Sequence, residues 1–236
     1  MSAVTEQEFL FTPPAREVAT NAIDVHAVSM PARTFTGDFW FTNRENDRLW
    51  FALGDVAGKG LPAALVMAMI QEELEQRMTS CARAGCDPAT TVARLHAFLR
   101  PLLPRNRFAT AVMGWLRDDG VLKIVNAGHC PPLVVRADGT IESIGSTGPV
   151  VGLLTSPRWS ATTRTLGRGD RLVLYSDGVV EAMSPDGAEF GEERVEELLD
   201  APFESSREVA NAIIEAVSDH AKGETADDTT VLVIGR

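Results

Sequence analysis

The stretch LGDVAGKGLPAAL, residues 53–65, constrains the fold of this chain more than any other. The apolar run before it, residues 49–53, is typical of a buried strand. After it, Leu61 begins an apolar segment in which Pro62 suits the first turn of a helix. Three glycines between the two would let the backbone pass close to a ligand or an ion. The stretch therefore predicts a strand that delivers Asp55 into a glycine-rich turn, with a turn whose glycines only relieve strain as the open alternative.

A phosphate-binding P-loop is one function that this stretch disfavours. Such a loop needs G-x-x-x-x-G-K followed by Ser or Thr, whose hydroxyl meets magnesium. Here the spacing from Gly54 to Gly58 is one residue short, and Gly60 stands where the hydroxyl is needed. A nucleotide-binding switch built on Gly58 and Lys59 is therefore not expected.

Composition excludes several classes of partner. The 236 residues carry 33 acidic and 22 basic side chains, a formal net charge of −11, which disfavours binding to nucleic acid or to an anionic membrane. No apolar run approaches the ~20 residues of a membrane span, and the N-terminus lacks the features of a secretory signal. The three cysteines (Cys81, Cys86 and Cys130) form no C-x-x-C motif, so we expect reduced thiols in a cytoplasmic protein.

Hydrophobic periodicity predicts strands towards both ends of the chain and helices between them. Because strands and helices do not alternate as βαβ units do, the pattern favours an α+β fold. We expect residues 1–21 to form an N-terminal arm and residues 22–236 to form one domain. Strands are expected at 23–30, 38–41, 49–55, 108–116, 121–125, 133–136, 140–143, 171–175 and 229–234. Helices are expected at 61–81, 88–103, 192–199 and 206–222, and a glycine-rich loop at 145–157.

Four aspartates share one setting, because each lies at the end of an expected strand: Asp38, Asp55, Asp177 and Asp227, the last with Asp228 beside it. Each alone could belong to a plain turn or cap. If the four strand ends converge, two such charges ~4 Å apart repel by about 4 kcal/mol, so the group must raise its pKa values or bind cations. Oxygen-only ligands select hard ions such as Mg²⁺ or Mn²⁺. Two such ions would suit the attack of water on phosphorus.

Five motifs follow one another along the chain: TGDF at 36–39, GDVAGKGLPAA at 54–64, NAGHCP at 126–131, YSDGV at 175–179 with Glu181, and DDTTV at 227–231. In this order they resemble the motifs of the metal-dependent protein phosphatases (the PPM family). The resemblance is greatest to the bacterial SpoIIE/RsbU-like serine phosphatase branch and covers residues 22–235. It implies a central antiparallel β-sandwich flanked by helices, with two Mn²⁺ or Mg²⁺ ions at one end of the sandwich.

The resemblance also implies roles for individual residues. Asp55 would bridge both ions, and the carbonyl of Val56 would complete one coordination shell. Asp38, Asp177 and Asp227 would supply the other carboxylates. A metal-bridging water would attack phosphorus, with no covalent phosphoenzyme. Asp228 corresponds less well to a ligand than to a turn residue that supports the ligands.

Three further residues have two open interpretations each. Arg33 lies where some members of the family bind the phosphate, but a solvated arginine in a turn fits equally well. His129 could serve acid–base chemistry, although its Asn-Ala-Gly-His setting at a strand end favours a structural turn. Lys59 could reach the phosphate or face water at the entry to the helix.

The chain departs from the family pattern at three places. Thr36 replaces the first glycine of the branch's usual Gly-Gly-Asp, and Trp40 and Phe41 replace its usual Tyr-Asp. Ala57 stands where eukaryotic relatives carry a histidine proposed as general acid, so the leaving group must be protonated by solvent or by another residue. None of these changes removes an expected metal ligand, so we expect an active enzyme.

The branch implies a substrate and a pathway as well. Its members commonly dephosphorylate serine or threonine on a STAS-domain anti-sigma factor antagonist, and so switch a sigma factor in a partner-switching pathway. We expect regulation through a partner, through a homodimer formed by the helices after Leu61, or through a segment outside this chain. The alternative is a catalytically silent PPM-like module that binds a phosphorylated regulator.

Overall fold

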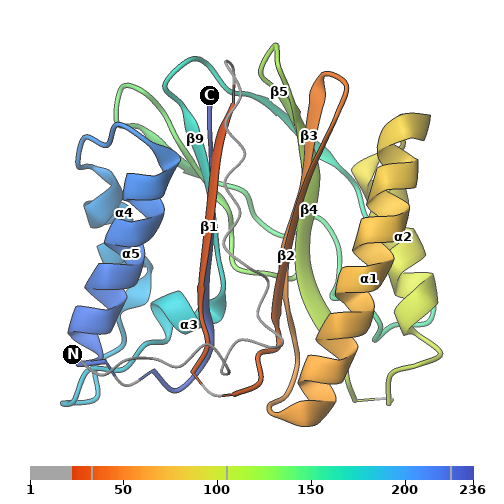
Figure 1. Cartoon of the computed structure of the whole chain (residues 1–236), viewed down its shortest axis with the longest axis horizontal. Helices are drawn as coiled ribbons and strands as arrows, with labels where there is room; N and C mark the ends of the chain where they lie inside the picture. The colour runs from red at the N-terminus through yellow and green to blue at the C-terminus, as the bar shows by residue number, and fades with distance from the viewer. Residues whose placement is uncertain (1–22, 33, 105, 224) are drawn as a thin grey trace.

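The computed structural model describes residues 23–236 except 33, 105 and 224, with only the backbone of residues 82 and 83. Two antiparallel sheets pack face to face, and each is covered on its outer side by helices (Figure 1). The expected arm at 1–21 and Arg33 lie outside the described residues. The expectation of an α+β fold with a β-sandwich flanked by helices is confirmed.

The first sheet joins the two ends of the described chain. Its strand order is β1-β10-β9-β6-β7, and β1 pairs with β10 so that Asp24 faces Gly235. β10 also pairs with β9 in the antiparallel sense, so the segments that precede β10 and follow β9 lie at the same end of the sandwich. The strands are β1 (Asp24–Met30), β10 (Thr229–Gly235), β9 (Arg171–Tyr175), β6 (Leu133–Val135) and β7 (Ile141–Ser143).

The second sheet is a meander of four consecutive strands, and a strand from later in the chain, β8, pairs with its last strand. Its order is β2-β3-β4-β5-β8, so consecutive strands are neighbours until the last. The turn between β2 and β3 contains Asn46 with φ of 55°, a left-handed conformation that asparagine tolerates. The strands are β2 (Asp38–Glu45), β3 (Arg48–Val56), β4 (Ala109–Arg117), β5 (Val121–Ala127) and β8 (Thr162–Thr165).

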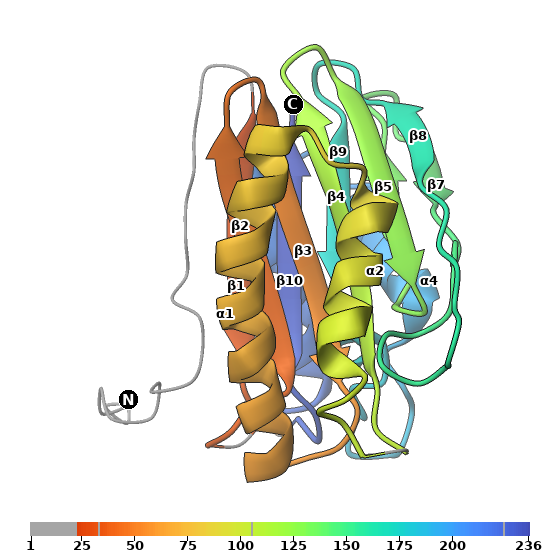
Figure 2. The same cartoon turned by 90° about the vertical axis from the view of Figure 1, so that its right-hand side faces the viewer.

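The helices form two outer layers. α1 (Leu61–Ala84) and α2 (Pro88–Leu99) lie side by side across the second sheet (Figure 2). α3 (Asp177–Val180), α4 (Gly191–Leu199) and α5 (Ser206–His220) cover the first sheet. Among the described helices, none has both the length and the apolar character needed to cross a membrane.

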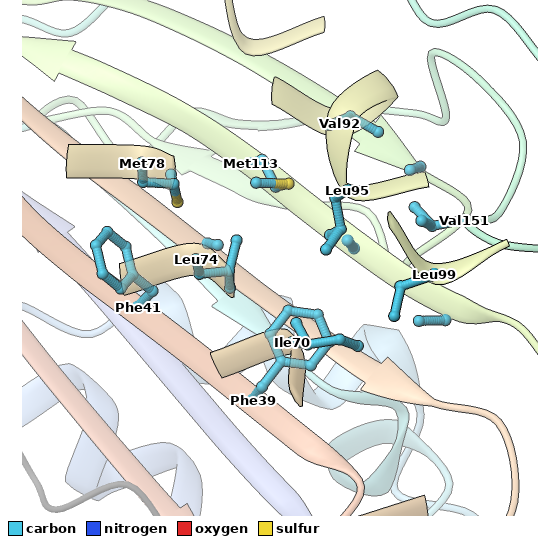
Figure 3. Close-up of a cluster of buried hydrophobic side chains, with 14 of the residues drawn as sticks. Phe39, Phe41, Ile70, Leu74, Met78, Val92, Leu95, Leu99, Met113 and Val151 are labelled. Carbon is cyan, nitrogen blue, oxygen red and sulfur yellow. The ribbon is translucent and has the colours of Figure 1, made fainter. Parts of the chain in front are cut away.

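Three apolar layers hold these parts together, one between the sheets and one under each set of helices. The layer below α1 and α2 contains Ile70 and Leu74 of α1 together with Phe39 of β2 (Figure 3). Leu95 and Leu99 of α2 close the same layer. The helix spacing of four residues therefore brings one face of each helix into the core.

The structure corrects several expected boundaries. α1 continues to Ala84 rather than ending near Cys81. α2 ends at Leu99 rather than Leu103, because the amides of residues 102 and 103 both bond the Leu99 carbonyl in a turn. Strand β8 was not expected, because its Thr-Thr-Arg-Thr sequence has no apolar alternation. The segment 145–157 contains isolated bridges through Gly148 and Val151, but is otherwise irregular as expected.

Candidate active site

Asp38 and Asp55 come from neighbouring strands of the second sheet. They face each other in the register of β2 and β3, Asp38 as the first residue of its strand and Asp55 as the last but one. Asp38 is only 2% exposed and accepts a hydrogen bond of 2.6 Å from the hydroxyl of Thr230. Burial, followed by the charge of Asp55, raises the pKa of Asp38 well above its usual range.

Asp177 and Asp227 come from the first sheet. Asp177 is the first residue of α3, just after β9, and Asp227 lies just before β10, which is the neighbour of β9. Burial and then the charge of Asp227 raise the pKa of Asp177. The pairing of β9 with β10 thus brings Asp177 and Asp227, which are 50 residues apart in the sequence, to the same end of the sheet.

The pKa of Asp55 is affected by charges from the other sheet. Its pKa is raised to about 7, first by burial and then by the charges of Asp177, Asp227 and Asp228. These charges belong to the other sheet, so the strand ends of both sheets converge at the end of the sandwich where α3 lies and α1 begins (Figure 1). Such a cluster favours a bound cation.

Asp228 organises the loop before β2. Its two carboxylate oxygens accept hydrogen bonds of 2.9 Å from the backbone amides of Ala32 and Gly37. Asp228 is 9% exposed, and its carbonyl accepts a hydrogen bond from the buried hydroxyl of Ser176. It therefore ties three chain segments together directly behind Asp38.

Two glycines are required by close approach of the backbone. A Cβ at Gly178 would collide with the carbonyl oxygen of Asp228. A Cβ at Gly37 would lie 2.7 Å from Oδ1 of Asp55 and 3.1 Å from the carbonyl oxygen of Val56. The side-chain oxygen of Asp55 and the main-chain oxygen of Val56 thus face the same position.

A pocket opens beside these acids, and a lysine lies in it. Its lining includes Phe35, Gly37, Asp55 and the turn at 58–60. Nζ of Lys59 lies 2.8 Å from Oδ2 of Asp227 and 3.3 Å from the carbonyl oxygen of Ala226. Lys59 is therefore held against the acidic cluster and does not simply face water.

The donor set of this site fits a hard divalent cation. All its charged donors are carboxylates, as Mg²⁺ and Mn²⁺ prefer, and the raised pKa of Asp55 shows that negative charge is in excess. Among the described residues, no three His, Cys, Asp or Glu side chains close around one point as metal ligands. The fold brings the acids within electrostatic range, and the roles of individual ligands stay predictions.

His129 lies in a rigid, buried turn. The side chain of Asn126 accepts a hydrogen bond from the His129 amide and donates to the carbonyl oxygens of His129 and Ile144. Nδ1 of His129 lies 2.8 Å from the hydroxyl of Thr110, and burial lowers the pKa of His129 to about 4. The imidazole is neutral at physiological pH, which accords with a structural turn.

Sequence reasoning did not single out four residues that support the site. Ser176 and Thr230 lie inside two of the motifs quoted above, at 175–179 and 227–231. Thr110 and Arg107 lie in no motif. The Arg107 guanidinium donates a hydrogen bond of 2.5 Å to the carbonyl of Ala57, and its position behind Gly58 has no local sequence signal.

Comparisons with known proteins agree with this fold. The family model described as Stage II sporulation protein E (SpoIIE) matches residues 45–236. Phosphoserine phosphatase RsbU of Bacillus subtilis is 26% identical over 238 residues, covering 100% of this chain and 69% of that protein. Protein IcfG of Synechocystis is 29% identical over 90% of this chain, but the match spans only 38% of IcfG. The crystal structure of the RsbU and RsbW domains of a Mycobacterium tuberculosis protein superposes with a TM-score of 0.76 at 25% identity, covering 91% of this chain and 60% of that one.

Proposed function

Since the chain belongs to the SpoIIE family, we propose that it is a metal-dependent phosphatase that hydrolyses phosphoserine or phosphothreonine in a protein. The observation that carries this proposal is the convergence of acids from both sheets, which raises the pKa of Asp55 to about 7. The phosphoserine phosphatase RsbU, matched over the whole of this chain, supports the same reaction class.

Two Mn²⁺ or Mg²⁺ ions are part of the proposal. Asp55 would contact both, with Asp38, Asp177, Asp227 and the carbonyl of Val56 as the other ligands. Bound ions would polarise a water for attack on phosphorus and neutralise charge on the phosphoryl group. An all-oxygen donor set with excess negative charge supports this assignment.

The other residues of the site position these groups. The Thr230 hydroxyl orients the carboxylate of Asp38, and Asp228 holds the loop that leads to it. Since Ala57 has no acidic proton and His129 is buried with a pKa of about 4, neither of them protonates the leaving group. The leaving group is therefore protonated by solvent or by another residue.

The substrate that we propose is a phosphorylated STAS-domain antagonist of an anti-sigma factor, in a partner-switching pathway. Support comes from the likeness to RsbU and to a protein that joins RsbU and RsbW domains. A cytoplasmic location belongs to the same proposal and is supported by three free cysteines. The chain spans only 38% of IcfG, so regulation by a homodimer, a partner or further segments is likewise a proposal.

Phosphate release tests the proposed function. A phosphoserine peptide and an aryl phosphate are incubated with the protein while Mn²⁺ is titrated, with a chelator as control. We expect Mn²⁺-dependent release that falls roughly 100-fold or more in Asp55→Asn and Asp177→Asn, since each would remove a metal ligand. Asp200→Asn, at an exposed position beyond α4, is the matched control and should keep full activity.

Two outcomes would contradict the proposal. Full Mn²⁺-dependent turnover in folded Asp177→Asn would contradict the assignment of Asp177 as a metal ligand of the site. Binding of a phosphorylated STAS-domain protein without turnover at saturating Mn²⁺ would instead establish the silent binding module.

A further inference from the structure

The chain leaves α1 through a turn that brings two cysteines together. Gly85 adopts a left-handed conformation with φ of 66°, and the amide of Cys86 donates a hydrogen bond of 3.0 Å to the carbonyl of Cys81. This is the six-residue Schellman ending of a helix, in which the side chains of the first and last residues contact each other. Here both of those residues are cysteines.

The two thiols and one arginine form a cluster. Cys81 is fully buried in the layer beneath α1 and α2, and Cys86 is half-buried against the same layer. Their thiols lie within hydrogen-bonding reach of each other. Nη1 of Arg94, on α2, donates to Sγ of Cys81 at 3.0 Å and to Sγ of Cys86 at 3.6 Å.

The backbone that carries Cys86 is held in place. The next residue, Asp87, caps α2 by accepting a hydrogen bond of 2.9 Å from the amide of Ala89, and its other carboxylate oxygen pairs with Lys123 of β5. The thiols therefore meet in a fixed corner between α1 and α2. This corner lies at the end of α1 far from the acidic cluster (Figure 2).

We propose that Cys81 and Cys86 are a redox-active dithiol, which a peroxide converts to an intrachain disulfide that fastens the end of α1 to the start of α2. The inference goes beyond the proposed function and does not depend on it. It uses a pair of cysteines that the expected chemistry of the acidic site leaves unexplained.

The reaction balances with one molecule of hydrogen peroxide. The sulfur of half-buried Cys86 attacks the O–O bond, forms a sulfenic acid and releases the other oxygen as water. The sulfur of Cys81 then attacks the sulfenic sulfur, the S–S bond forms, and a second water leaves. Two electrons and two protons pass from the thiols to the peroxide.

The charges around Cys86 affect its oxidation by peroxide, and the proximity of Cys81 affects the formation of the disulfide. Burial and the neighbouring Cys81 raise the pKa of Cys86, while Arg94 acts in the opposite direction, so the first step is slower than for an exposed thiolate. The second step joins two groups that already lie side by side, which gives it the advantage of an intramolecular reaction. A disulfide is therefore expected to form before the sulfur is oxidised further.

Peptide mapping of the full chain tests this inference. Arg83 lies between the two cysteines, so trypsin separates MTSCAR (78–83) from AGCDPATTVAR (84–94). After peroxide treatment, alkylation of free thiols and digestion, we expect the two peptides to stay joined until a reductant is added. The intact mass should fall by about 2 Da, as loss of two hydrogens requires.

Three variants sharpen the test. Cys130→Ser should give the same joined peptides, since burial and nearby acids raise the pKa of Cys130 to about 12 and keep it unreactive. Cys86→Ser, at a half-buried position, should give none while keeping the helical circular dichroism of the wild type; Cys86→Ala replaces it if folding is impaired. Arg94→Gln should slow cross-linking several-fold, because it removes the charge that favours the thiolate.

Other results would overturn the inference. A sulfinic acid at Cys86 without joined peptides, a disulfide between two chains, or both thiols still free to alkylation after prolonged millimolar peroxide would each exclude the intrachain disulfide. Equal rates in the wild type and Arg94→Gln would remove the role of Arg94.

Discussion

Asp38 and Asp55 are direct partners across the ladder of β2 and β3, two acids facing each other at a buried strand end. Like charges in this position repel and destabilise a sheet. Burial and then the charge of Asp55 raise the pKa of Asp38 well above its usual range. Burial and then the charges of Asp177, Asp227 and Asp228 raise the pKa of Asp55 to about 7. Without cations, the site therefore holds protons that an unfolded chain would release.

The raised pKa of Asp55 makes the stability of the protein depend on pH. In a chelator, the free energy of unfolding should fall as pH rises from about 4 to 7, because over that window the unfolded state ionises Asp55 and the folded state does not. Asp55 contributes on the order of a few kcal/mol to this fall. Urea unfolding at a series of pH values measures it. Asp55→Asn should flatten the dependence, and an unchanged slope would refute the assignment.

The role of Asp228 can be separated from that of the expected ligands. In Asp228→Asn, the side-chain NH₂ replaces an oxygen that now accepts from the amide of Ala32 or Gly37. Loss of such a hydrogen bond costs about 1.5–3 kcal/mol of stability, and Mn²⁺ affinity should weaken roughly 10- to 100-fold, as for other residues that orient ligands. Calorimetric titration with Mn²⁺ measures this, with Asp200→Asn as control. An unchanged Mn²⁺ affinity would show that the loop is held by other contacts.

Lys59 competes with any cation for Asp227. Their ion pair is about half exposed, with side-chain exposures of 55% and 42%, so it is worth at most ~1 kcal/mol. Lys59→Gln should therefore tighten Mn²⁺ binding by no more than about fivefold, as that free energy allows. The dissociation constant for Mn²⁺ reports the effect. Weaker Mn²⁺ binding in the variant would contradict competition. A large rise in KM for the phosphopeptide at unchanged metal affinity would indicate instead that Lys59 contacts phosphate.

Gly178 tests how tightly α3 packs against the segment before β10. Gly178→Ala would force a methyl group into the carbonyl oxygen of Asp228, and such overpacking costs about 1–3 kcal/mol. Gly145→Ala is the matched control, because nothing lies within 4 Å of a Cβ there. Urea unfolding compares the two. Equal stabilities would show that the backbone around Gly178 relaxes freely.

Local patterns were sufficient to predict most elements. The run of β-branched and apolar residues at 229–234 predicts a strand, and the fourfold spacing of apolar residues after Leu61 predicts a helix; both elements form as expected. The one-turn helix at Asp177–Val180 was not expected, because four residues are too few to show a helical period. β8 was missed because its alternating side chains are all polar.

The acids of the candidate site could be named from the sequence, but their environment could not. Each aspartate lies at or next to one end of an apolar strand, and this much is visible in the chain. The proton on Asp55 depends on charges from the other sheet, and the Lys59–Asp227 pair joins residues far apart in the sequence. Arg33 lies outside the described residues, so its role stays a prediction.

The chain alone is enough to predict the class of fold, the strand ends that carry acids and the order of the motifs, because these depend on propensity and periodicity within single elements. Which elements are neighbours is evident only in the folded chain: β9 lies beside β10, Asp38 lies opposite Asp55, and Arg94 of α2 lies beside Cys81 of α1. Burial and strand pairing are set by residues distant along the chain. The pKa values and contacts that they create therefore follow from the folded arrangement and not from any one segment.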